Sequence, residues 1–191
     1  MDSIFVSDRM KLKVLCPAED TAKAFSLLDK NRQHLEAWLP WVETTTSVEH
    51  ERSYVKGALE RFQSGLGMEM GIYEFSTNRF DEDCWSLIGM CGIVRINRDD
   101  PQESYGDLGY WLDYDHCGQG IVTDCCTKLT DVAYTELNLE KLRIVAHEDN
   151  HSSISVANRL KFKLSDEKAG YYHSRFHDPN KLLVFVKYKN D

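Results

Sequence analysis

The segment that most constrains the fold runs from Asp107 to Thr123, where a strand pattern leads through a short glycine loop into a helix pattern. Apolar and aromatic residues dominate 108–112, and Gly118 and Gly120 follow within the loop. Glycine lets the backbone turn sharply and come close to a ligand. The first N–H groups of a helix lack partners, and its dipole favours negative charge. The loop therefore predicts a phosphate or pyrophosphate site.

The helix pattern after the loop leads to a further strand pattern at 142–146. The order strand, loop, helix, strand over 107–146 predicts a βαβ unit with two parallel strands. Upstream, turn residues separate strand patterns at 68–75, 85–96 and 105–113, which is typical of an antiparallel meander. Together they predict a mostly antiparallel sheet that contains one parallel pair.

Other patterns complete the chain. A strand is predicted at 11–15, a helix from Pro17 to about Lys30, a helix at 152–161 and a last strand at 181–189. Thr46 and Glu49 fit a capping box for a helix that ends near Gly65. Its apolar face is predicted to carry Val48, Val55, Ala58, Leu59 and Phe62.

The composition is that of an ordinary globular protein, with 42% hydrophobic and 28% charged residues among 191. This length suits one domain over 1–191. No apolar run approaches the roughly 20 residues of a membrane span, and no basic stretch followed by an apolar one marks a signal peptide. The net charge of −8 argues against nucleic-acid binding. The sequence predicts a cytoplasmic protein with no membrane or nucleic-acid partner.

The six cysteines do not predict a metal site or a disulfide framework. None lies in a C-x-x-C pair, and Cys125 and Cys126 fall on the apolar side of a helix. We expect reduced thiols. His147, Glu148 and Asp149 are adjacent on a strand end and point to opposite faces, so no metal site is expected there either.

Three blocks carry a resemblance to a known family. They are Leu108-Gly-Tyr-Trp-Leu112, His116-Cys-Gly-Gln-Gly-Ile121 and Asn150-x-x-Ser153-x-x-x-Ala157-Asn-Arg-Leu160, followed by Phe162. In combination they resemble the GNAT acetyltransferases, and within these the RimJ/RimL type, which acetylates ribosomal-protein N-termini. The match is dense from 107 to 162 and looser over most of the remaining chain.

The resemblance implies a mixed α/β GNAT fold, with a central, mostly antiparallel twisted sheet, a splayed parallel strand pair and flanking helices. It also implies acetyl-CoA as cosubstrate and no metal. The residues implied in acetyl-CoA binding are Trp111, Leu112 and Asp113 at the strand end, Cys117, Gly118, Gln119, Gly120, Ile121 and Val122 around the loop, and Asn150 and Ser153 on the later helix.

The reaction requires a base that takes a proton from the amine, a donor to the developing oxyanion and a proton for the departing thiolate. The resemblance implies Asp107 as the base and Ser153 as the acid, and it implies that Trp38 and Trp41 line the acceptor pocket. Near the position of a further family glutamate the chain has Tyr171, Tyr172 and His173.

Each site residue also has a plain structural explanation. The glycine loop could be a tight turn, Asp107 a hydrogen-bonded strand carboxylate, Ser153 a residue of a first helical turn, and the tryptophans a core patch.

The expected function is direct transfer of acetyl from acetyl-CoA to a primary amine, best a protein N-terminal α-amine. A small amine, such as a polyamine or an aminoglycoside, is one alternative acceptor, and a non-catalytic CoA-binding interaction module is another reading. The resemblance allows a homodimer.

Overall fold

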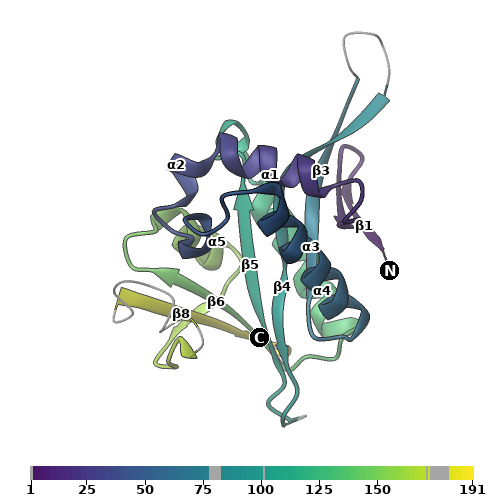
Figure 1. The fold of residues 1–191 in the computed structure, drawn as a ribbon. Helices are drawn as coiled ribbons and strands as arrows, with labels where there is room; N and C mark the ends of the chain where they lie inside the picture. The colour runs from purple at the N-terminus through teal and green to yellow at the C-terminus, as the bar shows by residue number, and fades with distance from the viewer. Residues whose placement is uncertain (1, 78–82, 101, 171, 173–180) are drawn as a thin grey trace.

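The computed structural model describes the chain except for residues 1, 78–82, 101, 171 and 173–180. Its strands form one sheet of eight in the order β1-β2-β3-β4-β5-β6-β8-β7 (Figure 1). The strands are β1 (Ser3–Ser7), β2 (Met10–Val14), β3 (Met68–Thr77), β4 (Asp83–Asn97), β5 (Tyr105–Leu112), β6 (Lys141–His147), β7 (Lys163–Ser165) and β8 (Leu182–Tyr188). The helices are α1 (Thr21–Lys30), α2 (Arg32–Leu35), α3 (Val48–Gln63), α4 (Ile121–Thr135) and α5 (His151–Arg159), with 3-10 turns η1 (Pro40–Val42) and η2 (Tyr114–His116).

The pairing of β5 with β6 differs from all the others in the sheet. These two strands run parallel, whereas the other neighbours are antiparallel. The parallel register ends at Asp107 and Arg143, although β5 continues to Leu112 and β6 to His147. The predicted fold class, a mostly antiparallel sheet with one parallel pair, is confirmed.

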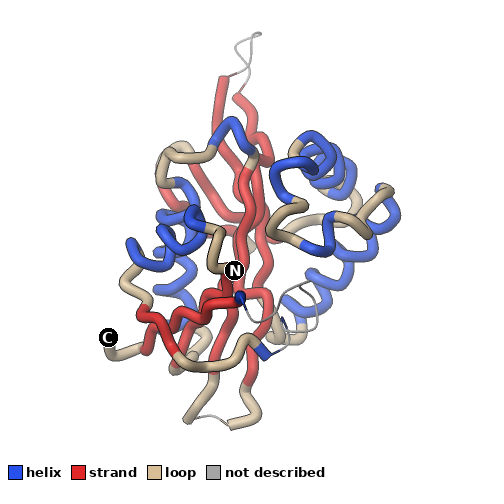
Figure 2. Tube along the Cα trace, turned by 90° about the vertical axis from the view of Figure 1, so that its left-hand side faces the viewer, coloured by secondary structure: helices blue, strands red, loops and turns tan. Residues whose placement is uncertain are grey.

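Helices cover both faces of the sheet, which Figure 2 shows nearly edge on. On one face α1 and α3 pack together and, with α2, bury a cluster that includes Val55 of α3, Met90 of β4 and Trp111 of β5. On the other face α4 and α5 cover the larger cluster, in which Cys125 and Cys126 are fully buried. Burial of these two thiols agrees with their predicted core role.

Two helix starts differ from the prediction. The N-cap of α3 is Ser47, one residue after the predicted Thr46, because the Ser47 hydroxyl accepts the His50 N–H at 3.3 Å. The Nδ1 atom of His50 accepts the Thr46 N–H in return, so histidine takes the part predicted for Glu49. Helix α1 begins at Thr21 rather than at Pro17.

Two short strands were not predicted from the sequence. Strand β1 lies at one edge of the sheet and alternates between exposed and half-buried residues, and β7 has three residues at the other edge. Edge strands bury little apolar surface, so their sequence periodicity is weak.

Candidate active site

The glycine loop after β5 has the open backbone that an anion site needs. Gly118 and Gly120 have φ of +79° and +84°, a region that disfavours side chains. Gly120 is the N-cap of α4 and has no side-chain cap, so no side chain of the cap occupies the first N–H groups of that helix. A Cβ built on either glycine meets nothing within 4 Å, so the space over the loop is accessible to a ligand. The predicted loop residues from Cys117 to Val122 therefore lie together around an open helix N-terminus, a type of backbone that can bind an anion.

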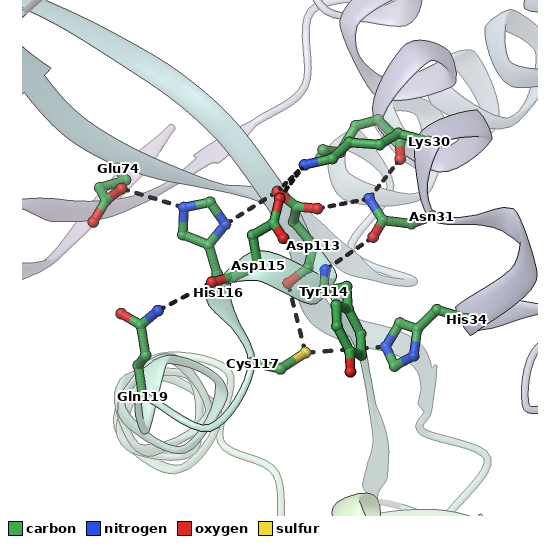
Figure 3. Close-up of polar contacts among 11 residues, drawn as sticks. Lys30, Asn31, His34, Glu74, Asp113, Tyr114, Asp115, His116, Cys117 and Gln119 are labelled. Atoms are coloured by element: carbon green, nitrogen blue, oxygen red, sulfur yellow. Dashed lines mark hydrogen bonds and ion pairs between the residues drawn. The ribbon is translucent and has the colours of Figure 1, made fainter.

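Asp113, at the end of β5, connects the loop to the end of α1 (Figure 3). Its side chain is buried and accepts hydrogen bonds from Lys30 Nζ at 2.9 Å and Asn31 Nδ2 at 2.9 Å, and it lies 3.1 Å from His116 Nδ1. The Asn31 side-chain oxygen in turn accepts the Tyr114 N–H at 2.8 Å. Burial would raise the pKa of Asp113, but the hydrogen bonds from Lys30 and Asn31 outweigh it and lower this pKa.

Lys30 also pairs with Asp115, the second carboxylate of this region. Its Nζ atom lies 2.8 Å from Asp115 Oδ2, and the hydrogen bonds to Asp115 and Asp113 raise the pKa of Lys30. Lys30 therefore pairs with two carboxylates beside the glycine loop. No sequence pattern indicates this contact, because 83 and 85 residues separate Lys30 from its partners.

A hydroxyl pair connects β5 with α5 across the sheet face that α4 covers. Tyr110 Oη lies 2.8 Å from Ser153 Oγ. Burial raises the pKa of Tyr110, so the phenol stays protonated. Asn150 caps α5 by accepting the Ser153 N–H at 3.1 Å. The structure thus brings Asn150 and Ser153 together at the start of α5 and adds Tyr110, which the sequence reasoning missed although it lies in the Leu-Gly-Tyr-Trp-Leu block.

Asp107 lies in a buried ion pair at the last register position that β5 shares with β6. Its two oxygens contact Arg143 Nε at 2.7 Å and Arg143 Nη2 at 3.2 Å, and both side chains are buried. Glu167 and the Tyr105 ring also contact the guanidinium, at 3.5 Å and 4.2 Å. Both Asp107 oxygens are therefore engaged by a cation, and its role as the base stays a prediction.

The two predicted acceptor-pocket tryptophans lie in different surroundings. The ring of Trp38 is 6.2 Å from that of His147, the last residue of β6. Trp41 is 38% exposed and stacks on Tyr54 of α3, with ring centroids 6.3 Å apart. Trp38 thus lies at the open end of the parallel strand pair, whereas Trp41 covers the outer surface of α3.

Comparison with known proteins agrees with this arrangement of an open glycine loop and two parting strands. A family model of the acetyltransferase (GNAT) domain matches residues 9–163. The chain belongs to the GNAT acetyltransferase family.

Full-length relatives agree with this GNAT assignment. The ribosomal-protein-serine acetyltransferase of Escherichia coli (strain K12) is 29% identical over 182 residues, which cover 94% of this chain and 94% of the relative. RimL, a ribosomal L7/L12 alpha-N-protein acetyltransferase solved with coenzyme A, has a TM-score of 0.80 at 23% identity and covers 97% of both chains. The microcin C7 self-immunity acetyltransferase MccE, solved with acetyl-CoA and AMP, has a TM-score of 0.80 at 19% identity, covering 98% of this chain and 96% of its own. The two solved structures share the fold with this GNAT chain.

As a GNAT enzyme, the protein is an acetyl-CoA-dependent N-acetyltransferase, and acetyl-CoA is its cosubstrate. Within the described part of the chain, no group of three or more His, Cys, Asp or Glu side chains could hold a metal ion. No helix in that part is long and apolar enough to cross a membrane.

The predicted candidates near residue 172 are only partly described. Tyr171 and His173 lie outside the described residues. Tyr172 is half-buried and packs against a small cluster that includes Val184 and Val186 of β8. Its position on this cluster gives it a packing role beside the sheet.

Proposed function

We propose that this GNAT enzyme acetylates the N-terminal α-amine of a protein. The observation that carries the acetyl-CoA part of the proposal is the parting of β5 from β6 along the strand that leads to the open Gly118–Gly120 loop. This arrangement combines an unpaired strand edge with an anion site, and acetyl-CoA has both an amide-rich arm and a pyrophosphate. The acceptor class is supported by the ribosomal-protein-serine acetyltransferase that matches over nearly the whole chain.

In this proposal the pyrophosphate binds the backbone N–H groups from Cys117 to Val122, with Gln119 at the loop surface. Beyond Asp107, the edge of β5 that faces β6 has no strand partner among the described residues, so backbone groups as far as Trp111, Leu112 and Asp113 can pair with the pantetheine amides. Asn150 and Ser153 then lie beside the thioester end. Acetyl-CoA thus completes the sheet between its two parallel strands.

Ser153 is the proposed acid toward the CoA thiolate. Its hydroxyl contacts Tyr110 Oη at 2.8 Å, which orients the serine, and the serine regains from water the proton that it gives to the sulfur. Cys117 is an unsuitable nucleophile, because desolvation of its sulfur and the nearby Asp113 carboxylate raise its pKa. The acetyl group therefore passes directly to the amine, without an acyl-enzyme.

Asp107 suits a positioning role in this scheme. Its two contacts to Arg143 hold β5 and β6 together at the last residue before they part, which fixes where the opening begins. Trp38 borders the opening at the end of β6, and we propose that it and Trp41 line the path of the acceptor.

We also propose that residues 1–191 act as one acetyltransferase domain in the cytoplasm. A single sheet includes strands from Ser3 to Tyr188, and the family match covers most of it. The homodimer stays a prediction that analytical ultracentrifugation can check.

The test is an acceptor screen that follows release of CoA thiol and the mass of the product. Peptides that begin with Ser or Ala should gain one acetyl group at the N-terminus, and the same peptides with a blocked N-terminus should not react. Turnover of spermidine or an aminoglycoside without turnover of the peptides would replace the protein acceptor by a small amine. Acetyl-CoA binding in a calorimeter without turnover of any amine would favour an interaction module.

A further inference from the structure

Helix α3 contains a buried carboxyl group that no contact explains. Glu51 is only 3% exposed, and in the described part of the chain its side chain has no hydrogen bond or ion pair. Other buried carboxylates do have partners: Asp107 pairs with Arg143, Asp113 with Lys30 and Glu69 with Arg61. Because burial of an unpaired acid is unfavourable, an unpaired acid in a fold of this kind points to a functional use.

The Glu51 carboxylate is nevertheless within reach of water. Among the described residues, Tyr73 Oη is the only side-chain oxygen or nitrogen that is both sealed from solvent and without a partner. The unpartnered oxygens of Glu51 therefore keep a narrow contact with solvent. A group in this position can exchange a proton with a small molecule or a bound amine.

Glu51 lies on the buried stripe of α3, which covers the same face of the sheet as Trp111 at the end of β5. Glu51, Val55 and Ala58 are the buried residues of α3, and their spacing puts them on one stripe of the helix. Val55 packs in the same cluster as Trp111, near the end of β5, so Glu51 lies one turn earlier on the same sheet-facing stripe. Figure 1 shows the start of α3 in front of the sheet, beside the arrowhead of β5.

This is the face opposite the proposed acid. Tyr110 and Ser153 meet on the side of the sheet covered by α4 and α5, whereas α3 covers the other side (Figure 2). The segment that leads into α3 includes Trp38, which lies at the end of β6. An acceptor that enters past Trp38 would reach the opening between the strands from the side of Glu51.

We propose that Glu51 is the general base of the acetyl transfer, taking the proton from the acceptor amine directly or through one water. This inference rests on the function proposed above. As the amine nitrogen bonds to the thioester carbonyl carbon, its proton passes to the Glu51 carboxylate. The C–S bond breaks, its electron pair leaves on the CoA sulfur, and the sulfur takes a proton from Ser153 to give the thiol. Base and acid thus act from opposite faces of the sheet.

The acidity of Glu51 supports this role. Burial raises the pKa of Glu51 to about 7, which is the range in which a base accepts protons well at neutral pH. The ionisable groups on the elements packed against α3 include Tyr54 on the same helix, Tyr73 of β3, and Glu69 with its Arg61 partner further along. Burial alone accounts for the raised pKa of Glu51.

The test compares Glu51→Gln with Glu49→Gln, an exposed glutamate of the same helical turn that pairs with Arg52. The rate constant kcat is measured from pH 5.5 to 9 with whichever amine the acceptor screen shows to react. The wild type and Glu49→Gln should gain activity as the pH rises through about 7. Glu51→Gln should lose about 100-fold or more in kcat and lose that rise, with an unchanged KM for acetyl-CoA. Circular dichroism and calorimetric binding of acetyl-CoA confirm that each variant is folded.

Two further variants distinguish the loss of a base at Glu51 from other causes of lost activity. Glu51→Asp retains a carboxylate and should recover part of the activity together with a pH-dependent rise. Asp107→Asn should keep the rise of the wild type. If Glu51→Gln keeps the wild-type rate and profile, or if the rise vanishes only in Asp107→Asn, the proposal is overturned. The identity of the reacting amine, peptide or spermidine, decides the acceptor question separately.

Discussion

Asp107 and Glu51 are both buried carboxyl groups, but their surroundings differ in one decisive respect. Asp107 has a guanidinium on both of its oxygens, 2.7 Å away at the nearer contact, whereas Glu51 has no partner among the described residues. A buried acid that is paired with a cation can hold two strands together. A buried acid without a cation has a raised pKa and can change its protonation near neutral pH. The presence of a partner, rather than burial, therefore separates a structural acid from a reactive one.

The largest expected effect comes from removing the partner of Asp107. Arg143→Met leaves a buried carboxylate without its cation, which should lower the free energy of unfolding by about 3 to 5 kcal/mol in urea denaturation. The double variant Asp107→Asn with Arg143→Met should lose much less, because no charge is left unpaired. A loss below about 1 kcal/mol in Arg143→Met would show that the pair does not hold β5 to β6.

Removing the charge of Glu51 should raise the free energy of unfolding, whereas removing the cation beside Asp107 should lower it. The pKa of Glu51 is about 7 in the folded protein and 4.5 otherwise, so its ionisation opposes folding as the pH rises through this range. Glu51→Gln should therefore raise the free energy of unfolding by about 3 kcal/mol at pH 8 and change it little at pH 4.5. Urea denaturation at both pH values measures this. An equal effect at the two pH values would mean that Glu51 is not the titrating group.

A substitution in the glycine loop tests acetyl-CoA binding without changing either Asp107 or Glu51. Gly120→Val forces a β-branched side chain into a left-handed backbone and into the space over the loop, so acetyl-CoA affinity should fall about tenfold or more in calorimetry. Gly65→Val is the matched control, since Gly65 has φ of +72° and equally open surroundings at the end of α3. Undiminished binding in folded Gly120→Val would remove the loop from the pyrophosphate site.

The smallest effect on acetyl-CoA affinity is expected from a change beside Asp113, because several groups donate hydrogen bonds to this carboxylate. Lys30→Met removes the cation shared with Asp115 but leaves Asn31 and His116 in contact with Asp113. Because Lys30 is half exposed, acetyl-CoA affinity should fall only a few-fold, and less at high salt. Lys23→Met, on the same helix, should have no effect on binding. A loss as large as that of Gly120→Val would make Lys30 a principal binding group.

Much of the fold could be predicted because it depends on local patterns. The strand at 105–112, the left-handed glycines and the apolar stripe of α4 are each encoded within about fifteen residues. The exact cap of α3 was missed by one residue, since Thr46 and Ser47 are both good caps and only the contact with His50 distinguishes them. The edge strands were missed because they bury little.

The site was less predictable because its contacts join distant segments. The bonds from Lys30 to Asp113 and from Arg143 to Asp107 connect residues 83 and 36 positions apart. Glu51, in contrast, could have been found. It lies three residues after Val48 and four before Val55, on the stripe predicted to be apolar, and a lone acid on such a stripe is a signal that the helix pattern alone provides.

The early end of the β5–β6 pairing also affects how readily the protein can aggregate. In the part of the chain that the structure describes, the edge of β5 that faces β6 has no strand partner beyond Asp107, and another extended chain could form hydrogen bonds along it. With acetyl-CoA bound along this edge as we propose, the cosubstrate and a peptide strand would compete for the same backbone groups. Bound acetyl-CoA would then protect the enzyme from aggregation. In enzyme without acetyl-CoA, a strand from another chain would pair with β5 most easily.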